Sequence, residues 1–513
     1  MTYSALHNAG GAMTQADVVQ RVPGNVVRMH RKPVLTPLLA GLLAVGFAAS
    51  PALSARDATP PLAVPAHGVI GVDDAKLTPA YWVARLDAPD APLLPPAAIA
   101  ARNAWLLQAD ESMHDLAALP LQVDRATIRA LVEDLSSRPT RTLYDVDGGE
   151  LPVATIDALM ANLDLDGIPS MQAQRFGMVV ERAPLRTYPT DLRAFSRAGE
   201  TDIDRFQESA LFPGTPVAIL HASGDGHWWF VVSPRYAAWI PRSAVAEGSR
   251  EQVLAYGARA PYRIVTGAEE HTVDTREAPQ VSALQLDMGV RVPLSDVPLD
   301  RPVNGQHPYT SWVVDLPVSG PDGRLAFQPA LLPKIADTAP DYLPLTRANL
   351  VRPAFKFLGE RYGWGHSYDG RDCSGFVSEV YRSMGVQLPR NTSDQAVSPV
   401  FARRAFGEGD SREARLAAAK ALDVGDLVYI PGHVMMVIGH VDGQPYVIHD
   451  TNGGSYVGDD GALVHMGLNG VVVTPLLPMA FNETETYVDR MTAIVSPQEV
   501  SPQRAGPQQG ATE

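Results

Sequence analysis

The chain has very little cysteine: Cys373 is the single such residue among 513. One thiol excludes an internal disulfide and supplies at most one ligand to a metal site. The sequence shows no cluster of histidines and carboxylates with metal-ligand spacing, so we expect no metal and no other cofactor. The cysteine is therefore either a reactive nucleophile or a buried, inert residue.

Positive charge is also scarce, because 42 Lys and Arg residues face 57 Asp and Glu residues and leave a formal net charge of -15. This balance argues against nucleic acid as a partner, since phosphates require basic surfaces.

Long hydrophobic runs are scarce as well. Residues 34–49 form an uncharged apolar run that is short for a membrane span, with basic residues before it and small residues at 51–55. This pattern predicts a signal peptide within residues 1–55, read from Met29 or Met13 as the true start. We expect an exported protein, in the periplasm, without a stable membrane span after processing.

The length and composition indicate several globular domains rich in loops. A chain of 513 residues is too long for one core, and 44 prolines and 42 glycines favour short strands. Residues 56–175 predict a linker followed by helices at 95–107 and 125–135. Short alternating runs at 216–220 and 228–232 predict a small barrel within residues 176–255, and residues 256–342 have a similar texture.

The residues that follow Cys373 predict a helix. Val377, Val380, Tyr381 and Met384 recur at three- and four-residue spacing. Cys373 would then lie at the helix N-terminus, where unpaired N–H groups and the helix dipole favour a thiolate.

Two histidines downstream are candidates for a base and its partner. Residues 425–430, 433–439 and 444–449 predict three successive antiparallel strands, with His433 opening the second and His449 closing the third. A thiol nucleophile needs a base within hydrogen-bond reach, and the base needs a third group to fix its tautomer. The alternative is that both histidines are structural residues of apolar strands.

The segment Asp372-Cys-Ser-Gly-Phe376, followed by His433-Val and by His449, resembles the NlpC/P60 cysteine peptidases. Residues 205–241 resemble a bacterial SH3 domain, and the order of domains is similar to that of γ-D-glutamyl-L-diamino acid endopeptidases. The resemblance implies an α+β fold in which a cysteine-bearing helix packs on an antiparallel sheet. This papain-like domain would span residues 343–480. An N-terminal helical segment and two SH3 barrels, at 176–255 and 256–342, would precede it, and a tail would follow at 481–513.

The resemblance also implies the catalytic roles. Cys373 would be the nucleophile, His433 its base and His449 the group that orients the base. The Tyr362 hydroxyl and the Cys373 backbone N–H would hold the oxyanion.

For the substrate, the resemblance implies a muropeptide, or peptidoglycan stem peptide, with a free N-terminal L-alanine. The Asp372 carboxylate would face its ammonium group, and Tyr236 would close the pocket from the barrel side. The alternative for Asp372 is a helix N-cap. Asn391 and Thr392 stand where the family has Asp and Ser, and His366 stands where a glycine is common, which puts the substrate preference in doubt. Besides Asp372 and Tyr236, the candidate substrate contacts are Ser374, Trp364, Asn391 and Thr392.

Three functions remain open. The first is a cell-wall cysteine endopeptidase that cuts the γ-D-glutamyl-L-diamino acid bond. The second keeps the nucleophile but cuts another peptidoglycan amide, either the muramoyl-L-alanine bond or a crosslink. The third is a non-enzymatic wall-binding protein that works through its SH3 domains.

Overall fold

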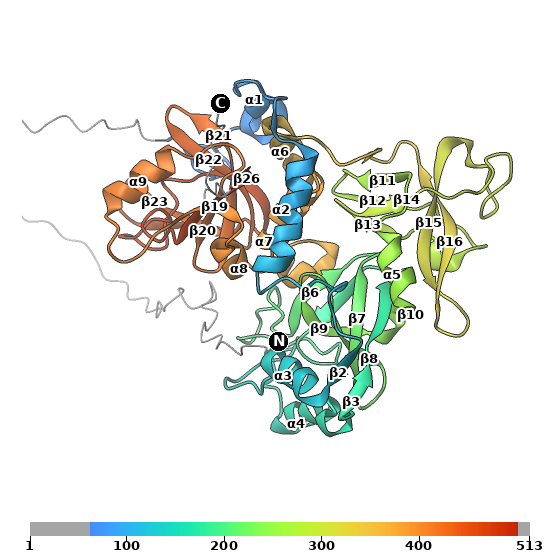
Figure 1. Cartoon of the computed structure of the whole chain (residues 1–513). Coiled ribbons are helices and arrows are strands. Elements are labelled where there is room, and N and C mark those ends of the chain that lie inside the picture. The colour runs from blue at the N-terminus through green and yellow to red at the C-terminus, as the bar shows by residue number, and fades with distance from the viewer. Residues whose placement is uncertain (1–61, 501–513) are drawn as a thin grey trace, which may run out of the picture. The chain divides into compact units, whose positions relative to one another are not determined.

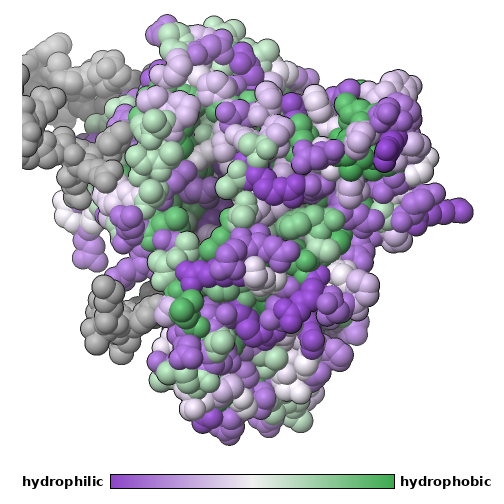
Figure 2. Space-filling model, turned by 45° about the vertical axis from the view of Figure 1, so that its right-hand side comes forward, coloured by the Kyte–Doolittle hydropathy of each residue, from purple (hydrophilic) through white to green (hydrophobic). Residues whose placement is uncertain are grey.

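A computed structural model of the protein describes residues 62–500 (Figure 1). The predicted signal peptide at 1–55 lies outside these described residues. Among residues 62–500, no helix is both long and apolar enough to cross a membrane. Figure 2 shows that hydrophilic residues cover most of one face, with hydrophobic residues confined to separate patches.

The N-terminal segment is helical: its first part shares a core with the C-terminal part of the chain, and its second part shares a core with the sheet that follows it. Its helices are α1 (Pro79–Val83), α2 (Pro96–Ala109), α3 (Arg125–Leu135) and α4 (Val153–Asn162), and its strands are β1 (Pro92–Leu94), β2 (Gln122–Asp124) and β3 (Met171–Ala173). Helices α2 and α3 confirm the two predicted from the sequence. Proline begins α2, and the Asp124 carboxylate caps α3 by accepting a hydrogen bond from the Thr127 N–H at 2.8 Å. Trp82 and Leu106 are buried in the same core as Cys373.

A seven-stranded antiparallel sheet follows, in the order β10-β4-β7-β8-β9-β5-β6. Its strands are β4 (Arg175–Val179), β5 (Ala183–Arg186), β6 (Gln207–Leu211), β7 (Pro216–Ala222), β8 (Trp228–Val232), β9 (Ala237–Pro241) and β10 (Val245–Gly248). Strands β7 and β8 confirm the predicted strands. Trp228 and Trp229 point to opposite faces and enter two different hydrophobic cores, as successive residues of a strand do.

The next segment contains three small separate sheets rather than one continuous one. It comprises helix α5 (Arg250–Tyr256) and the strands β11 (Tyr262–Val265), β12 (Glu269–His271), β13 (Gln285–Asp287), β14 (Arg291–Pro293), β15 (Ser311–Ser319), β16 (Leu325–Pro333) and β17 (Thr338–Ala339). A second SH3 domain here stays a prediction.

The C-terminal part has a six-stranded antiparallel sheet in the order β19-β26-β20-β21-β22-β25, against which helix α7 packs. The sheet consists of β19 (Phe401–Ala405), β20 (Leu427–Ile430), β21 (His433–Val441), β22 (Gln444–Thr451), β25 (Gly470–Pro475) and β26 (Ala493–Val500). The helices are α6 (Arg347–Ala354), α7 (Cys373–Arg382), α8 (Thr392–Val397) and α9 (Arg412–Lys420), and the remaining strands are β18 (Leu345–Thr346), β23 (Gly454–Val457) and β24 (Leu463–Met466). The cysteine helix and the three histidine-region strands lie as the sequence predicted.

One boundary differs from the expectation. We expected a tail from residue 481, but β26 pairs with both β19 and β20 inside the sheet. The main-chain groups of β20 need a partner on this side because a buried, unpaired backbone is costly. The C-terminal domain therefore extends at least to residue 500.

Candidate active site

Cys373 is the first residue of α7, and the residue before it caps this helix. Asp372 has an extended backbone, and its Oδ1 accepts a hydrogen bond from the Gly375 N–H at 2.8 Å. The cap fixes where the helix starts, and so it fixes the position of the thiol. Cys373 is buried, at 5% exposure, in the core between α7 and the sheet.

The expectation of a thiolate at the helix end is wrong for the resting protein. Burial, followed by the negative charge of Asp372, raises the pKa of Cys373 to about 12, while the Val434 N–H acts in the opposite direction. Desolvation of the charged form outweighs the helix dipole here. The thiol is therefore protonated at rest, and a base must take its proton during attack.

The two predicted histidines are hydrogen-bonded to each other. Nε2 of His433, on β21, lies 2.8 Å from Nδ1 of His449, on β22. Nε2 of His449 lies 3.0 Å from Oγ1 of Thr474, on β25. All three side chains are buried, so the neighbouring strands hold them in fixed orientations.

These two hydrogen bonds define which nitrogen of His433 can act as a base. Burial lowers the pKa of His433 to about 4 and that of His449 well below its usual value, so both rings are neutral at rest. When His449 donates its Nε2–H to Thr474, its Nδ1 accepts the Nε2–H of His433. The Nδ1 atom of His433 then carries the lone pair that can accept a proton.

Tyr362 is a suitable donor close to the nucleophile. It is buried, and burial together with the charges of Cys373 and Asp372 raises the pKa of its hydroxyl well above 10. The hydroxyl therefore keeps its proton and can donate a hydrogen bond to a developing oxyanion.

The Asp372 carboxylate is already paired by an arginine that the sequence analysis did not include among the site residues. Nη2 of Arg390 lies 2.7 Å from Oδ2 of Asp372, and Nη1 lies 3.1 Å from Oδ1. Burial opposes the charged form of Asp372, but Arg390 outweighs it and lowers the pKa to about 2. Ser374 joins this pair, since its hydroxyl donates to Oδ1 of Asp372 at 3.1 Å and accepts from Arg390 at 2.8 Å. Asp372 thus has the N-cap role, and its charge is compensated.

Tyr236 brings a second carboxylate to the same region, and the sequence analysis missed this one. The Tyr236 hydroxyl donates to Oε2 of Glu208 at 2.6 Å, and the Thr187 hydroxyl donates to Oε1. A side chain of β6 also contacts the arginine: Nε of Arg390 donates to the Ser209 hydroxyl at 2.6 Å. Glu208 is half-buried, accepts from two hydroxyl groups and forms no salt bridge within residues 62–500, so its carboxylate can pair with a cation.

The three other candidates are Trp364, Asn391 and Thr392, and their described positions are set by contacts within the protein. Trp364 donates its indole N–H to the Gln207 carbonyl at 3.1 Å and so ties the loop before the nucleophile to β6. Asn391 and Thr392 begin helix α8, where Asn391 donates to Asp394 at 3.0 Å. The residues after Asn391 are therefore helical, from Thr392 to Val397.

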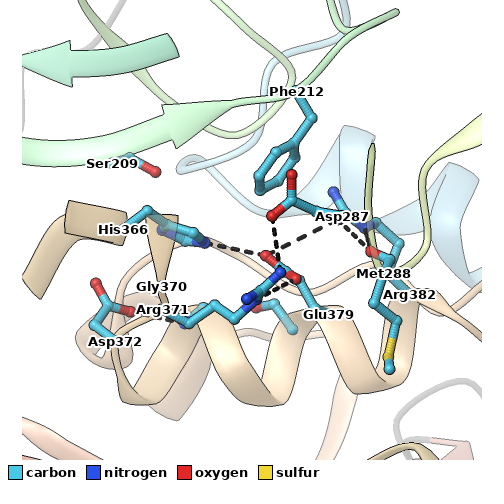
Figure 3. A network of polar contacts seen from close by, with 12 residues as sticks. Ser209, Phe212, Asp287, Met288, His366, Gly370, Arg371, Asp372, Glu379 and Arg382 are labelled. Carbon is cyan, nitrogen blue, oxygen red and sulfur yellow. Dashed lines mark hydrogen bonds and ion pairs between the residues drawn. The ribbon is translucent and has the colours of Figure 1, made fainter. Parts of the chain in front are cut away.

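A buried charge network joins α7 to the loop before it (Figure 3). The two nitrogens of the His366 ring lie 3.0 Å from Arg390 and 3.2 Å from Glu379. Glu379 accepts from Nε of Arg371 at 2.8 Å, and Nη2 of Arg371 donates to Asp287 at 2.8 Å. His366 has a φ of 64°, a conformation that favours glycine, and the network holds its side chain in place. Residues 62–500 contain no cluster of ligands that would hold a metal ion.

Comparisons with known proteins agree with this geometry. Residues 359–472 match the NlpC/P60 family, and residues 193–241 match an SH3 domain of the SH3b1 type. An NlpC/P60 endopeptidase from Photobacterium damselae subsp. piscicida is 16% identical, with a TM-score of 0.66 over 82% of this chain and 97% of the other. An NlpC/P60 family protein from Bacillus cereus is 20% identical, with a TM-score of 0.42 over 62% of this chain and 98% of the other.

No curated protein matches the chain. The likeness to the Photobacterium protein shows a shared fold, and the family match includes α7 and the strands that carry both histidines. The chain therefore contains an NlpC/P60 domain, the domain of a family of cysteine peptidases, together with an SH3 domain of the SH3b1 type.

Proposed function

We propose that the protein is an exported cell-wall cysteine endopeptidase that cuts the γ-D-glutamyl-L-diamino acid bond of muropeptides. The observation that supports it most is the hydrogen-bonded chain from His433 through His449 to Thr474, inside the domain whose α7 begins with Cys373. The signal peptide at 1–55 and a periplasmic location belong to the same proposal. So do the domain ranges 56–175, 176–255, 256–342 and 343–500.

The first half of the reaction forms a thioester. Nδ1 of His433 accepts the proton of Cys373 as the sulfur attacks the amide carbonyl carbon. The Tyr362 hydroxyl and the Cys373 N–H donate to the oxyanion, because the first N–H groups of a helix have no partner within it. When the C–N bond breaks, His433 gives its proton to the departing amine.

The second half releases the acyl group. Water attacks the thioester carbon and gives its proton to His433, and the C–S bond then breaks. The sulfur recovers the proton from His433, so the resting pair is restored. His449 stabilises the charged form of His433 in both halves by keeping its ring in position.

The geometry shifts the substrate-ammonium contact from Asp372 alone toward Glu208. The Asp372 charge is balanced by Arg390, whereas the Glu208 carboxylate has hydroxyl donors and is partly exposed. A free N-terminal ammonium group would bind between Glu208 and the ring of Tyr236. This contact would favour short peptides with a free amine over intact strands.

The test is mass spectrometry of L-Ala-γ-D-Glu-meso-diaminopimelate incubated with the protein. Release of L-Ala-D-Glu by the wild type but not by Cys373→Ala supports the peptidase. Release from the free amine but not from an N-acetylated peptide supports the specificity, and equal cleavage of both favours another amide bond. If both proteins leave the peptides intact and bind sacculi equally, the non-enzymatic alternative replaces the proposal.

A further inference from the structure

A cavity of about 210 Å³ lies beside the candidate active site, with Arg390 in its wall. It is lined by the turns after β6 and β8, by residues 289–291 and by one side of α7. Phe212, His366, Glu379 and Arg382 belong to its walls and are drawn in Figure 3. Cys373, Tyr362 and His433 are not among its lining residues, whereas Tyr236, from the proposed substrate contact, forms part of its wall.

The walls of this cavity carry an excess of positive charge. Its arginines are Arg235, Arg291, Arg382 and Arg390. Glu379 is the one carboxylate among the lining residues, and its Oε2 is already bonded to Arg371 at 2.8 Å. Arg390 is matched by Asp372, and Arg382 lies 4.0 Å from Glu379, which leaves Arg235 and Arg291 without a carboxylate partner among the lining residues.

Arg235 is the clearest case. The structure gives its side chain no hydrogen-bond or ion-pair partner within residues 62–500, and its Nε atom is buried. Burial, followed by repulsion from Arg382 and Arg390, lowers the pKa of Arg235 to about 9. Nη1 of Arg291, at the same cavity, is also buried without a hydrogen-bond partner. Buried guanidinium groups normally have partners because the loss of their hydration is costly.

We propose that this cavity binds a small organic anion, whose carboxylate or phosphate group pairs with Arg235. Arg382 and Arg390 add to the attraction because their charges also act at this position. Phe212, Pro234 and Val290 line the cavity and offer apolar surface to the body of the ligand. The planar guanidinium of an arginine can donate two hydrogen bonds to two oxygens of a carboxylate or of a phosphate group. The site does not depend on the peptidase reaction.

Isothermal titration calorimetry with glutarate and with inorganic phosphate, at constant ionic strength, tests this proposal on the full chain. We expect the wild type to bind at least one probe, which also separates a carboxylate from a phosphate ligand. Arg235→Gln should weaken that binding at least tenfold, whereas Arg276→Gln, an exposed arginine outside the cavity, should bind as the wild type does. Arg291→Gln is a second variant that should weaken binding.

The melting temperature without a probe shows whether the variants are folded. We expect Arg235→Gln to melt no lower than the wild type, because it removes a partly buried charge that has no partner within residues 62–500. The proposal is overturned if the wild type binds neither probe, or if Arg235→Gln and Arg291→Gln both bind as tightly as the wild type.

Discussion

Removing Arg371 should destabilise the protein more than any exposed charge does. The Arg371 side chain is 0% exposed and donates to Asp287, Glu360 and Glu379, each at 2.8 Å. Arg371→Met keeps much of the volume but leaves three carboxylates without their common cation. Breaking a buried ion pair in this way costs about 3–5 kcal/mol.

This cost corresponds to a fall of the melting temperature of about 10 °C, at roughly 2–4 °C per kcal/mol for a domain of this size. Differential scanning calorimetry at pH 7.5 measures it. The matched control is Arg352→Met on α6, where the ion pair with Asp90 is half exposed and should contribute about 0–1 kcal/mol.

The stability that Arg371→Met loses relative to the wild type should become smaller as the pH falls. Burial, followed by Glu379, raises the pKa of Asp287 to about 6, and Arg371 acts in the opposite direction. Because a raised carboxyl pKa means that the folded state binds the proton more readily, protonation of Asp287 stabilises the fold below about pH 6. A neutral Asp287 no longer needs the guanidinium, so Arg371→Met should lose less stability at pH 5 than at pH 7.5. A loss that matches Arg352→Met, or that stays the same at both pH values, would refute this reasoning.

Three further predictions concern the reaction. Thr474→Val should lower kcat roughly 10- to 100-fold with KM little changed, because it frees the tautomer of the histidine pair; a parallel loss of substrate affinity in steady-state kinetics would contradict this role. The pH profile of kcat/KM should be flat between pH 5 and 7, since the pKa of His433 is about 4 and that of Cys373 about 12, and should fall at about pH 8, where the α-amino group of the substrate loses its proton; a titration of the enzyme between pH 5 and 7 would show an ion pair at rest. Glu208→Gln should raise KM about 10- to 100-fold for free-amine peptides, and an unchanged KM would place Glu208 outside the ammonium contact.

The sequence predicted those parts of the site that depend on local patterns. The helix after Cys373 and the strands that carry His433 and His449 follow from spacing and turn residues within short windows. The contacts of Arg390 with Ser209 join residues 181 positions apart, and no local pattern reports such a pair. For the same reason, Glu208 was not identified.

Two expectations failed because tertiary packing outweighed a local effect. The helix N-terminus favours a thiolate at Cys373, but the complete burial of α7 on the sheet raises the thiol pKa instead. Residues after 481 lack a long apolar run, and the strand they contain, β26, is stable because its neighbours β19 and β20 supply the partners.

The position of β26 has a consequence for the order in which the domain can form. During synthesis, N-terminal parts of a chain are available to fold first. A nascent chain that has reached residue 480 contains Cys373 and both histidines, but it lacks the strand between β19 and β20. Helix α2 also lacks one of its contacts at that stage, because its Arg102 donates a hydrogen bond to the carbonyl of Pro497 within that strand. The sheet is completed only when residues 493–500 have emerged, so the candidate site is assembled after the chain has passed residue 500.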